Sequence, residues 1–115
     1  KEQWKQAIEY IHQHYKQGEK IVLFPESTYL PLSYYNDTNH YGLKWENIII
    51  AFPHDLNKRT PEEFNAELDM INNKVGKSNS VWLITRAENL PVSRVATKKA
   101  IDNVLRKKYK YEIYN

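Results

Sequence analysis

Three short polar stretches carry the side chains that could do chemistry in this chain, and each follows an apolar run. They are Pro25-Glu26-Ser27-Thr28, the pair His54 and Asp55, and the residues Arg86 and Glu88. A carboxylate and an imidazole such as Glu26 and His54 are the groups of a general acid/base pair, and a guanidinium such as Arg86 binds anions. The competing interpretation is a solvated loop without a ligand, because loops are generally polar.

Tyrosines add a second kind of candidate surface directly after the first polar stretch. The chain has nine Tyr, three Trp and three Phe, more aromatic rings than so small a core needs, so some are expected in a groove or at an interface. Tyr34 and Tyr35 can equally well cover the edge of a sheet. The candidate binding residues are therefore Pro25, Glu26, Ser27, Tyr29, Tyr34, Tyr35, His54, Asp55 and Arg86. No residue is assigned a catalytic role.

Composition disfavours several classes of site. The absence of cysteine excludes a structural disulfide, a thiolate zinc site and a cysteine nucleophile. Three glycines in the whole chain leave no P-loop and no dinucleotide fingerprint, and Ser27 does not lie on a Gly-x-Ser-x-Gly elbow. His12 and His14 are two residues apart on an expected helix and point to different faces. We therefore expect neither a metal nor a cofactor.

Positive charge is concentrated near the end of the chain. The formal net charge is +3, but residues 94–110 contain a single acidic residue, Asp102. The basic residues of the same segment are Arg94, Lys98, Lys99, Arg106, Lys107, Lys108 and Lys110. Such a segment can meet an anionic membrane surface, and a solvated helix face is the competing interpretation. No aromatic ring is interleaved with these charges before Tyr109, so nucleic acid is not expected as a partner.

The first half of the chain predicts two helices and two strands. The expected elements are a helix over 4–15 ended by Gly18, a buried strand over 20–24, a short helix over 28–35, a turn over 36–42 and a strand over 47–52. The first helix buries the residues at helical spacing, which are Trp4, Ala7, Ile8, Ile11 and Tyr15. Pro25 and Pro53 end the two strands.

The second half begins with the clearest local signal. Thr60-Pro61-Glu62-Glu63 offers an N-cap, a proline at the first helical position and a carboxylate three residues after the cap. The expected elements are a helix from there to Gly76, a strand over 80–85, a loop over 86–91, a helix over 93–108 and a strand over 111–114. The last helix is expected to bury Ala100, Ile101, Val104 and Leu105.

Alternation of helices and strands along the chain predicts the fold class. It indicates a single α/β domain over 1–115, with a three-layer, Rossmann-like, mainly parallel sheet of about four strands and helices on both faces. In such sheets ligands bind outside the carboxyl ends of the strands. The three polar stretches are therefore expected to share that edge.

Parts of this pattern resemble a known protein family. The matching residues are Trp4-Lys5-Gln6-Ala7-Ile8-Glu9-Tyr10-Ile11, Gly18-Glu19-Lys20 with the following strand, the loop residues Pro25, Pro31, Tyr34 and Tyr35, and Val81-Trp82-Leu83-Ile84. This pattern resembles the soluble region of polytopic membrane glycosyltransferases similar to dolichyl-phosphate-mannose–protein mannosyltransferases. The chain departs from it at Gln3, where an Asp is usual, and at Thr85-Arg86, where Ser-His is common.

The resemblance implies a specific place for this chain. It would be an accessory extracytoplasmic domain of a membrane glycosyltransferase that uses a polyprenyl-phosphate-sugar donor, with the catalytic part outside these residues. Its expected partners are the parent membrane domain and an acceptor saccharide or protein, and the chain would be a piece of a larger protein. The alternative is a free-standing small-ligand-binding or protein-interaction α/β module without catalysis.

Overall fold

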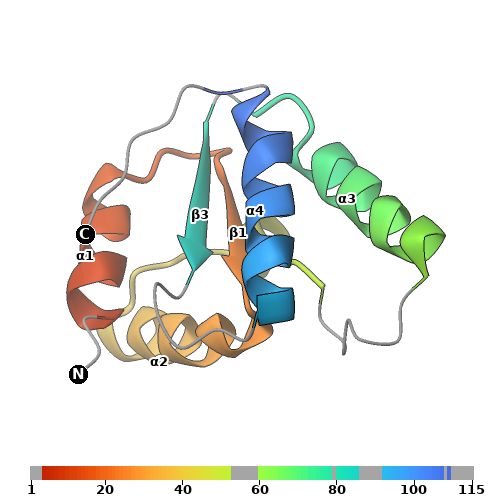
Figure 1. The fold of residues 1–115 in the computed structure, drawn as a ribbon. Helices are drawn as coiled ribbons and strands as arrows, with labels where there is room; N and C mark the ends of the chain where they lie inside the picture. The colour runs from red at the N-terminus through yellow and green to blue at the C-terminus, as the bar shows by residue number, and fades with distance from the viewer. Residues whose placement is uncertain (1–3, 53–59, 79, 86–91, 108, 110–115) are drawn as a thin grey trace.

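The computed structural model describes residues 4–52, 60–78, 80–85, 92–107 and 109, with the side chains of 92–94 excepted. Its elements, in chain order, are α1 (Trp4–His14), β1 (Lys20–Phe24), η1 (Glu26–Thr28), α2 (Tyr29–Asn39), η2 (Trp45–Asn47), β2 (Ile48–Ile50), α3 (Pro61–Val75), β3 (Val81–Thr85) and α4 (Val92–Arg106) (Figure 1). The expected alternation of helices and strands is confirmed over these residues.

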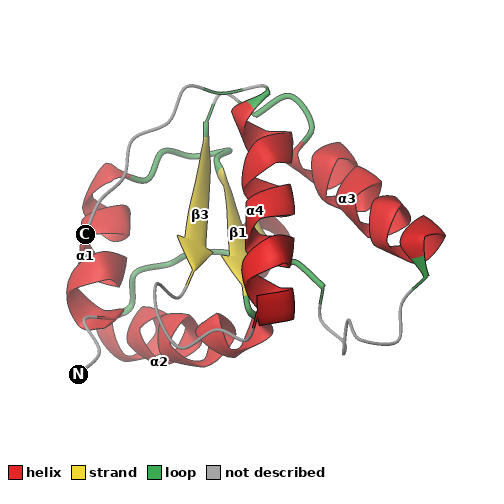
Figure 2. Ribbon diagram, in the orientation of Figure 1, coloured by secondary structure: helices red, strands yellow, loops and turns green. Residues whose placement is uncertain are grey.

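The described strands form one parallel sheet in the order β2-β1-β3, and Figure 2 shows β1 and β3 side by side. Ile21 lies opposite Ile48 on one side of β1, and Phe24 lies opposite Thr85 on the other. The carboxyl ends of the three strands therefore meet at one edge of the sheet, as the sequence predicts. The expected fourth strand over 111–114 lies outside the described residues.

Helices cover both faces of the sheet, because the apolar side chains of β1 alternate between two clusters. Val22 and Phe24 pack with residues of α3 and α4, such as Ile71 and Ile101. Ile21 and Leu23 instead join a cluster with the buried residues of α1 and α2, which are Ile8, Ile11 and Leu32. In Figure 1 the sheet stands between α1 on one side and α4 with α3 on the other. This is a three-layer α/β arrangement.

Two expected helix ends are wrong. The first helix ends at His14, one residue before the expected end, and Gly18 lies in the turn before β1 with a left-handed φ of 93°. The second helix continues through the expected turn to Asn39 and ends at His40 in the left-handed conformation. Asn36 remains helical because its side chain bonds beyond the helix: its amide donates to the Leu43 carbonyl and its oxygen accepts from the Leu43 N–H. A residue typical of turns here closes the loop after the helix.

The expected buried faces of the outer helices need smaller corrections. Ala7 is exposed on α1, although Ile8 and Ile11 are buried as predicted. On α4, Ile101 and Leu105 are buried, whereas Ala100 and Val104 are only half-buried. Thr97, four residues before Ile101, is also buried. The buried face of α4 is therefore rotated slightly about the helix axis from the predicted one.

The amino end of α3 confirms the predicted capping box. The Thr60 hydroxyl accepts from the Glu63 N–H at 3.1 Å, and the Glu63 carboxylate accepts from the Thr60 N–H at 2.9 Å. Pro61 occupies the first helical position and Gly76 is the C-cap. The N-cap, the first-position proline, the capping-box carboxylate and the C-cap glycine of this helix therefore all lie next to its ends in the sequence.

Replacing Thr60 with alanine is expected to lower the free energy of unfolding by about 1 kcal/mol, because one of the first N–H groups of α3 loses its acceptor. Urea unfolding followed by far-UV circular dichroism measures this change. Thr38→Ala, at an exposed position within α2, is the matched control and should change stability by less than about 0.5 kcal/mol. Equal effects of the two substitutions would contradict the capping role.

Candidate functional site

The loop after β1 places its polar residues in two different environments. Pro25 and Thr28 are buried, and the Thr28 hydroxyl and N–H both donate to the Pro25 carbonyl, at 2.8 Å and 3.0 Å. These bonds close η1 as a tight turn. Glu26 and Ser27 lie within that turn and are exposed at the carboxyl edge of the sheet. Of this stretch, Glu26 and Ser27 are the side chains available to a ligand.

The other two polar stretches lie outside the described residues, and His54, Asp55, Arg86 and Glu88 belong to them. The strands that precede these two stretches, β2 and β3, end at the same edge of the sheet as β1. In Figure 2 helix α2 runs across this edge, below the arrowheads of β1 and β3. Its buried Leu32 packs in the same cluster as Leu23 and Ile84 near the ends of those strands.

Phe52 sits in an unusual backbone conformation just past β2. Its φ of 51° is left-handed, although the residue is not glycine and its side chain is fully buried. The Phe52 N–H donates to the Glu67 carboxylate on α3 at 3.0 Å. The ring meets Phe24 edge-on and Phe64 at a tilt of 36°, with ring centroids 6.4 Å and 4.9 Å away. A defined hydrogen bond and two rings thus fix the direction in which the chain leaves β2.

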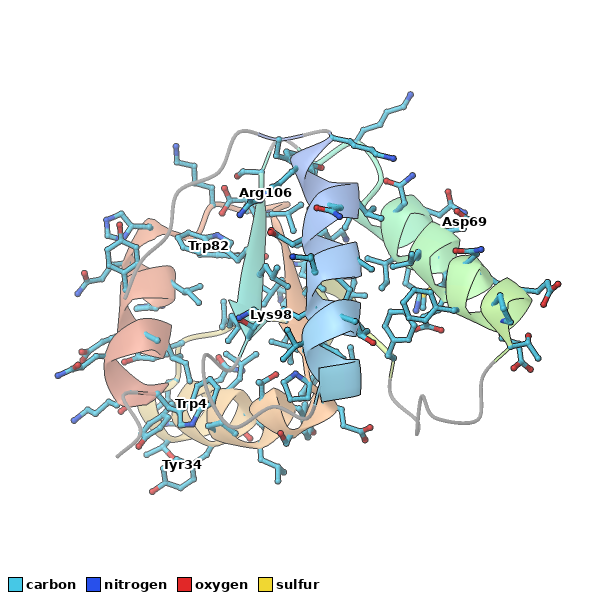
Figure 3. All side chains as sticks on the ribbon, in the orientation of Figure 1. Trp4, Tyr34, Asp69, Trp82, Lys98 and Arg106 are labelled. Carbon is cyan, nitrogen blue, oxygen red and sulfur yellow. The ribbon has the colours of Figure 1, made fainter. Side chains whose placement is uncertain are left out.

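Aromatic residues of α2 and of η2, the turn that enters β2, add exposed rings to the surface beside the sheet. The rings of Tyr29 and Trp45 lie 4.8 Å apart between centroids at an angle of 38°, and Trp45 is 49% exposed. We call these two residues the Tyr29–Trp45 pair. Tyr34 is 61% exposed and meets the half-buried Tyr35 edge-on. Figure 3 shows Tyr34 directed away from the sheet.

Trp45 is not among the candidate residues predicted from the sequence, because nothing local in Trp45-Glu46-Asn47 distinguishes this run from the beginning of the following strand. The structure makes it a turn of 3-10 helix that brings the indole against Tyr29, 16 positions earlier in the chain. Tyr29 itself is half-buried and packs against the α1–α2 cluster. One member of the pair is therefore anchored while the other is open to solvent.

A buried carboxylate lies at the opposite, amino edge of the sheet. Glu19, just before β1, is only 8% exposed, and it accepts hydrogen bonds from the Ser80 hydroxyl, the Trp82 indole N–H and the Lys16 N–H. The last two bonds are each 2.9 Å. Figure 3 shows Trp82 extending from β3 towards α1. Glu19 therefore connects the turn after α1 to the beginning of β3.

Hydrogen bonding also sets the protonation state of this group. Burial alone raises the pKa of a carboxyl, but the donors from Ser80, Lys16 and Trp82 together outweigh it and hold the pKa of Glu19 below its ordinary value. Glu19 is thus ionised at neutral pH with its oxygens engaged by protein donors. This arrangement is suited to holding the fold together rather than to proton transfer.

The basic segment does not form a uniform positive face. Arg106 pairs with Asp102 on the same helix at 2.9 Å, Lys99 and Lys107 are exposed, and Lys98 is half-buried. Figure 3 shows Lys98 and Arg106 at different heights along α4. The side chain of Arg94 and residues 108 and 110 lie outside the described part. A membrane contact through this segment stays a prediction.

Within the described ranges, no three His, Asp or Glu side chains gather closely enough to hold a metal ion. In the same part of the chain no helix is long and apolar enough to cross a bilayer. Comparison of the chain with protein-family models, with curated proteins and with solved structures found no match in any of the three.

Proposed function

We propose that this chain is a non-catalytic accessory domain on the extracytoplasmic side of a membrane glycosyltransferase that uses a polyprenyl-phosphate-sugar donor. In this proposal the catalytic groups belong to the parent membrane domain, and the soluble domain contacts the saccharide acceptor. We also propose that the fold is Rossmann-like, with a mainly parallel sheet of about four strands.

The Tyr29–Trp45 pair is the observation that carries the saccharide contact. An exposed indole face offers a flat apolar surface to the C–H face of a sugar ring, and Tyr29 limits its freedom from one side. Two exposed polar residues, Glu26 and Ser27, lie in η1, the turn before Tyr29. A few polar groups beside an apolar surface are the usual composition of a small-ligand site.

The packing of the residues that carry the family resemblance also supports the proposal. Trp4 from α1, Tyr35 from α2 and Trp82 from β3 all pack against the α1–α2 cluster. Residues far apart in sequence thus build one aromatic-rich face. We therefore expect proteins that share these aromatic residues at this spacing to pack the corresponding helices on the sheet in the same way.

Titration with neutral disaccharides such as mannobiose and cellobiose, followed by amide and indole NMR shifts, tests the saccharide contact. We expect shifts at Trp45 and around residues 26–29 at millimolar sugar, and their loss in Trp45→Ala. Val95→Ala, on α4 at 50% exposure, removes a comparably exposed apolar side chain and should leave the shifts unchanged. Shifts with nucleotides or inorganic phosphate, and none with sugars, would favour the small-ligand alternative and contradict the proposal.

The coding sequence upstream of Lys1 tests the membrane part independently. The proposal requires a series of apolar segments, each of roughly 20 residues, encoded before Lys1 in the same reading frame. A reading frame that begins within a few codons of Lys1 would remove the glycosyltransferase part. The sugar titration would still stand as a separate result.

A further inference from the structure

The triplet Asn36-Asp37-Thr38 has the Asn-x-Thr pattern of an N-glycosylation acceptor. It lies near the end of α2, where Asp37 and Thr38 are exposed and Asn36 is half-buried. We propose that Asn36 receives an N-linked glycan only while the chain is unfolded, and that folding closes this modification site. The inference goes beyond the proposed function and does not depend on the saccharide contact.

Glycan transfer needs the side-chain nitrogen of Asn36. The donor is an oligosaccharide joined through its anomeric carbon to a polyprenyl pyrophosphate. A bond forms between this carbon and Asn36 Nδ2, while the bond from the carbon to the pyrophosphate oxygen breaks. Nδ2 loses one of its two protons, and the polyprenyl pyrophosphate leaves with the electron pair of the broken bond. The transferring enzyme must therefore reach Nδ2 and replace one of its hydrogens.

In the folded chain both polar atoms of this side chain bond to one residue, Leu43. Asn36 Nδ2 donates to the Leu43 carbonyl at 3.1 Å, and Asn36 Oδ1 accepts from the Leu43 N–H at 3.0 Å. Both distances are those of ordinary hydrogen bonds. Exposure of the neighbouring Asp37 and Thr38 therefore does not make the reacting nitrogen accessible.

The geometry of the amide group excludes a glycan from this pair of bonds. Because Oδ1 and Nδ2 face the same residue, the hydrogen that Nδ2 directs at the Leu43 carbonyl lies on the same side of the planar amide as Oδ1. In a substituted amide the trans form is preferred, and it puts the substituent on the side of the oxygen. A glycan on Nδ2 would thus occupy the place of this hydrogen, where the two heavy atoms are 3.1 Å apart.

The loop that carries Leu43 cannot simply move aside. The Leu43 side chain is 7% exposed and packs in the cluster with Ile8 and Leu32. The Tyr41 N–H donates to the Asn36 carbonyl at 3.1 Å, and the Tyr41 ring stacks on His12 of α1 with ring centroids 4.1 Å apart. Freeing Nδ2 therefore requires the loop to leave both α1 and the core.

An oligosaccharyltransferase and a polyprenyl-pyrophosphate oligosaccharide test the proposal on the full chain. The substitutions Lys77→Asn and Asn79→Thr together add a second acceptor triplet, whose asparagine replaces an exposed lysine after α3. In this folded chain, checked by circular dichroism, we expect modification at position 77 to be at least about tenfold faster than at Asn36, since two hydrogen bonds hold Asn36 closed. Mass spectrometry of peptide digests measures both rates. A peptide of residues 33–41, which lacks Leu43, should be modified at Asn36.

Hydrogen exchange at the Asn36 side chain is a second readout that needs no enzyme. By NMR we expect the hydrogen directed at Leu43 to exchange at least about tenfold more slowly than the side-chain hydrogens of the exposed Asn39. This comparison decides if the enzyme modifies neither site of the folded chain. The proposal is overturned by equal exchange at Asn36 and Asn39, by equal modification of the two sites in the folded chain, or by an unmodified peptide.

Discussion

Replacing Glu19 with alanine is expected to lower the free energy of unfolding by about 3 kcal/mol, because three donors around this buried carboxylate lose their acceptor. The Ser80 hydroxyl, the Trp82 indole N–H and the Lys16 N–H all donate to this carboxylate. Urea unfolding at pH 7, followed by tryptophan fluorescence and circular dichroism, measures the change. Glu9→Ala, which removes an exposed carboxylate from α1, is the matched control and should stay within about 0.5 kcal/mol.

Glu19→Gln separates hydrogen bonding from charge. The amide keeps one acceptor oxygen but turns an NH₂ group towards donors, so we expect a loss of stability between that of the control and that of Glu19→Ala. A Glu19→Ala variant as stable as Glu9→Ala would show that the carboxylate does not connect the α1–β1 turn to β3.

The same residue predicts a pH dependence. Its pKa is lower in the folded chain than its ordinary value of 4.5, so the unfolded chain binds the proton more readily. The stabilisation is therefore fully present above pH 4.5 and is lost as the pH falls through the lower, folded pKa. Unfolding free energies measured between pH 7 and pH 3 should fall more steeply for the wild type than for Glu19→Gln.

Local signals explain which parts of the fold could be predicted from the sequence. The beginning of α3 is encoded by Thr60, Pro61 and Glu63 within four consecutive positions. From Ile21 to Phe24 the strand β1 is an uninterrupted apolar run, and its burial on both faces requires helices on both sides. These features can be predicted from neighbouring residues alone, without knowing the contacts to distant parts of the chain. The end of α2 was mispredicted because Asn36 forms its decisive bonds with Leu43, seven positions later.

The candidate site was predictable only in its position. Parallel strands that end at breakers locate a shared edge, and the described strands confirm that edge. Glu19 could not be recognised, because its side-chain donors lie 61 and 63 positions away in the chain. The contact between Phe52 and Glu67 likewise joins separate elements. Packing across the sheet, rather than any local pattern, decides which polar residue is buried and which ring is exposed.

Phe52 provides the second large effect. Phe52→Ala is expected to lower the free energy of unfolding by about 3–5 kcal/mol, because it removes a fully buried ring between Phe24 and Phe64. Urea unfolding at pH 7 measures the loss. The informative comparison is with Phe52→Gly, because both variants lack the ring and differ in the freedom of their backbone.

Glycine normally destabilises a folded segment by roughly 0.5–1 kcal/mol relative to alanine, because it loses more conformational entropy. At Phe52 the left-handed φ of 51° reverses the comparison, since a Cβ in that region costs roughly 1–2 kcal/mol. We therefore expect Phe52→Gly to be at least as stable as Phe52→Ala. At Ile49, in the extended strand β2, we expect the usual order, with the glycine variant less stable. Finding that usual order at both positions would contradict a left-handed Phe52.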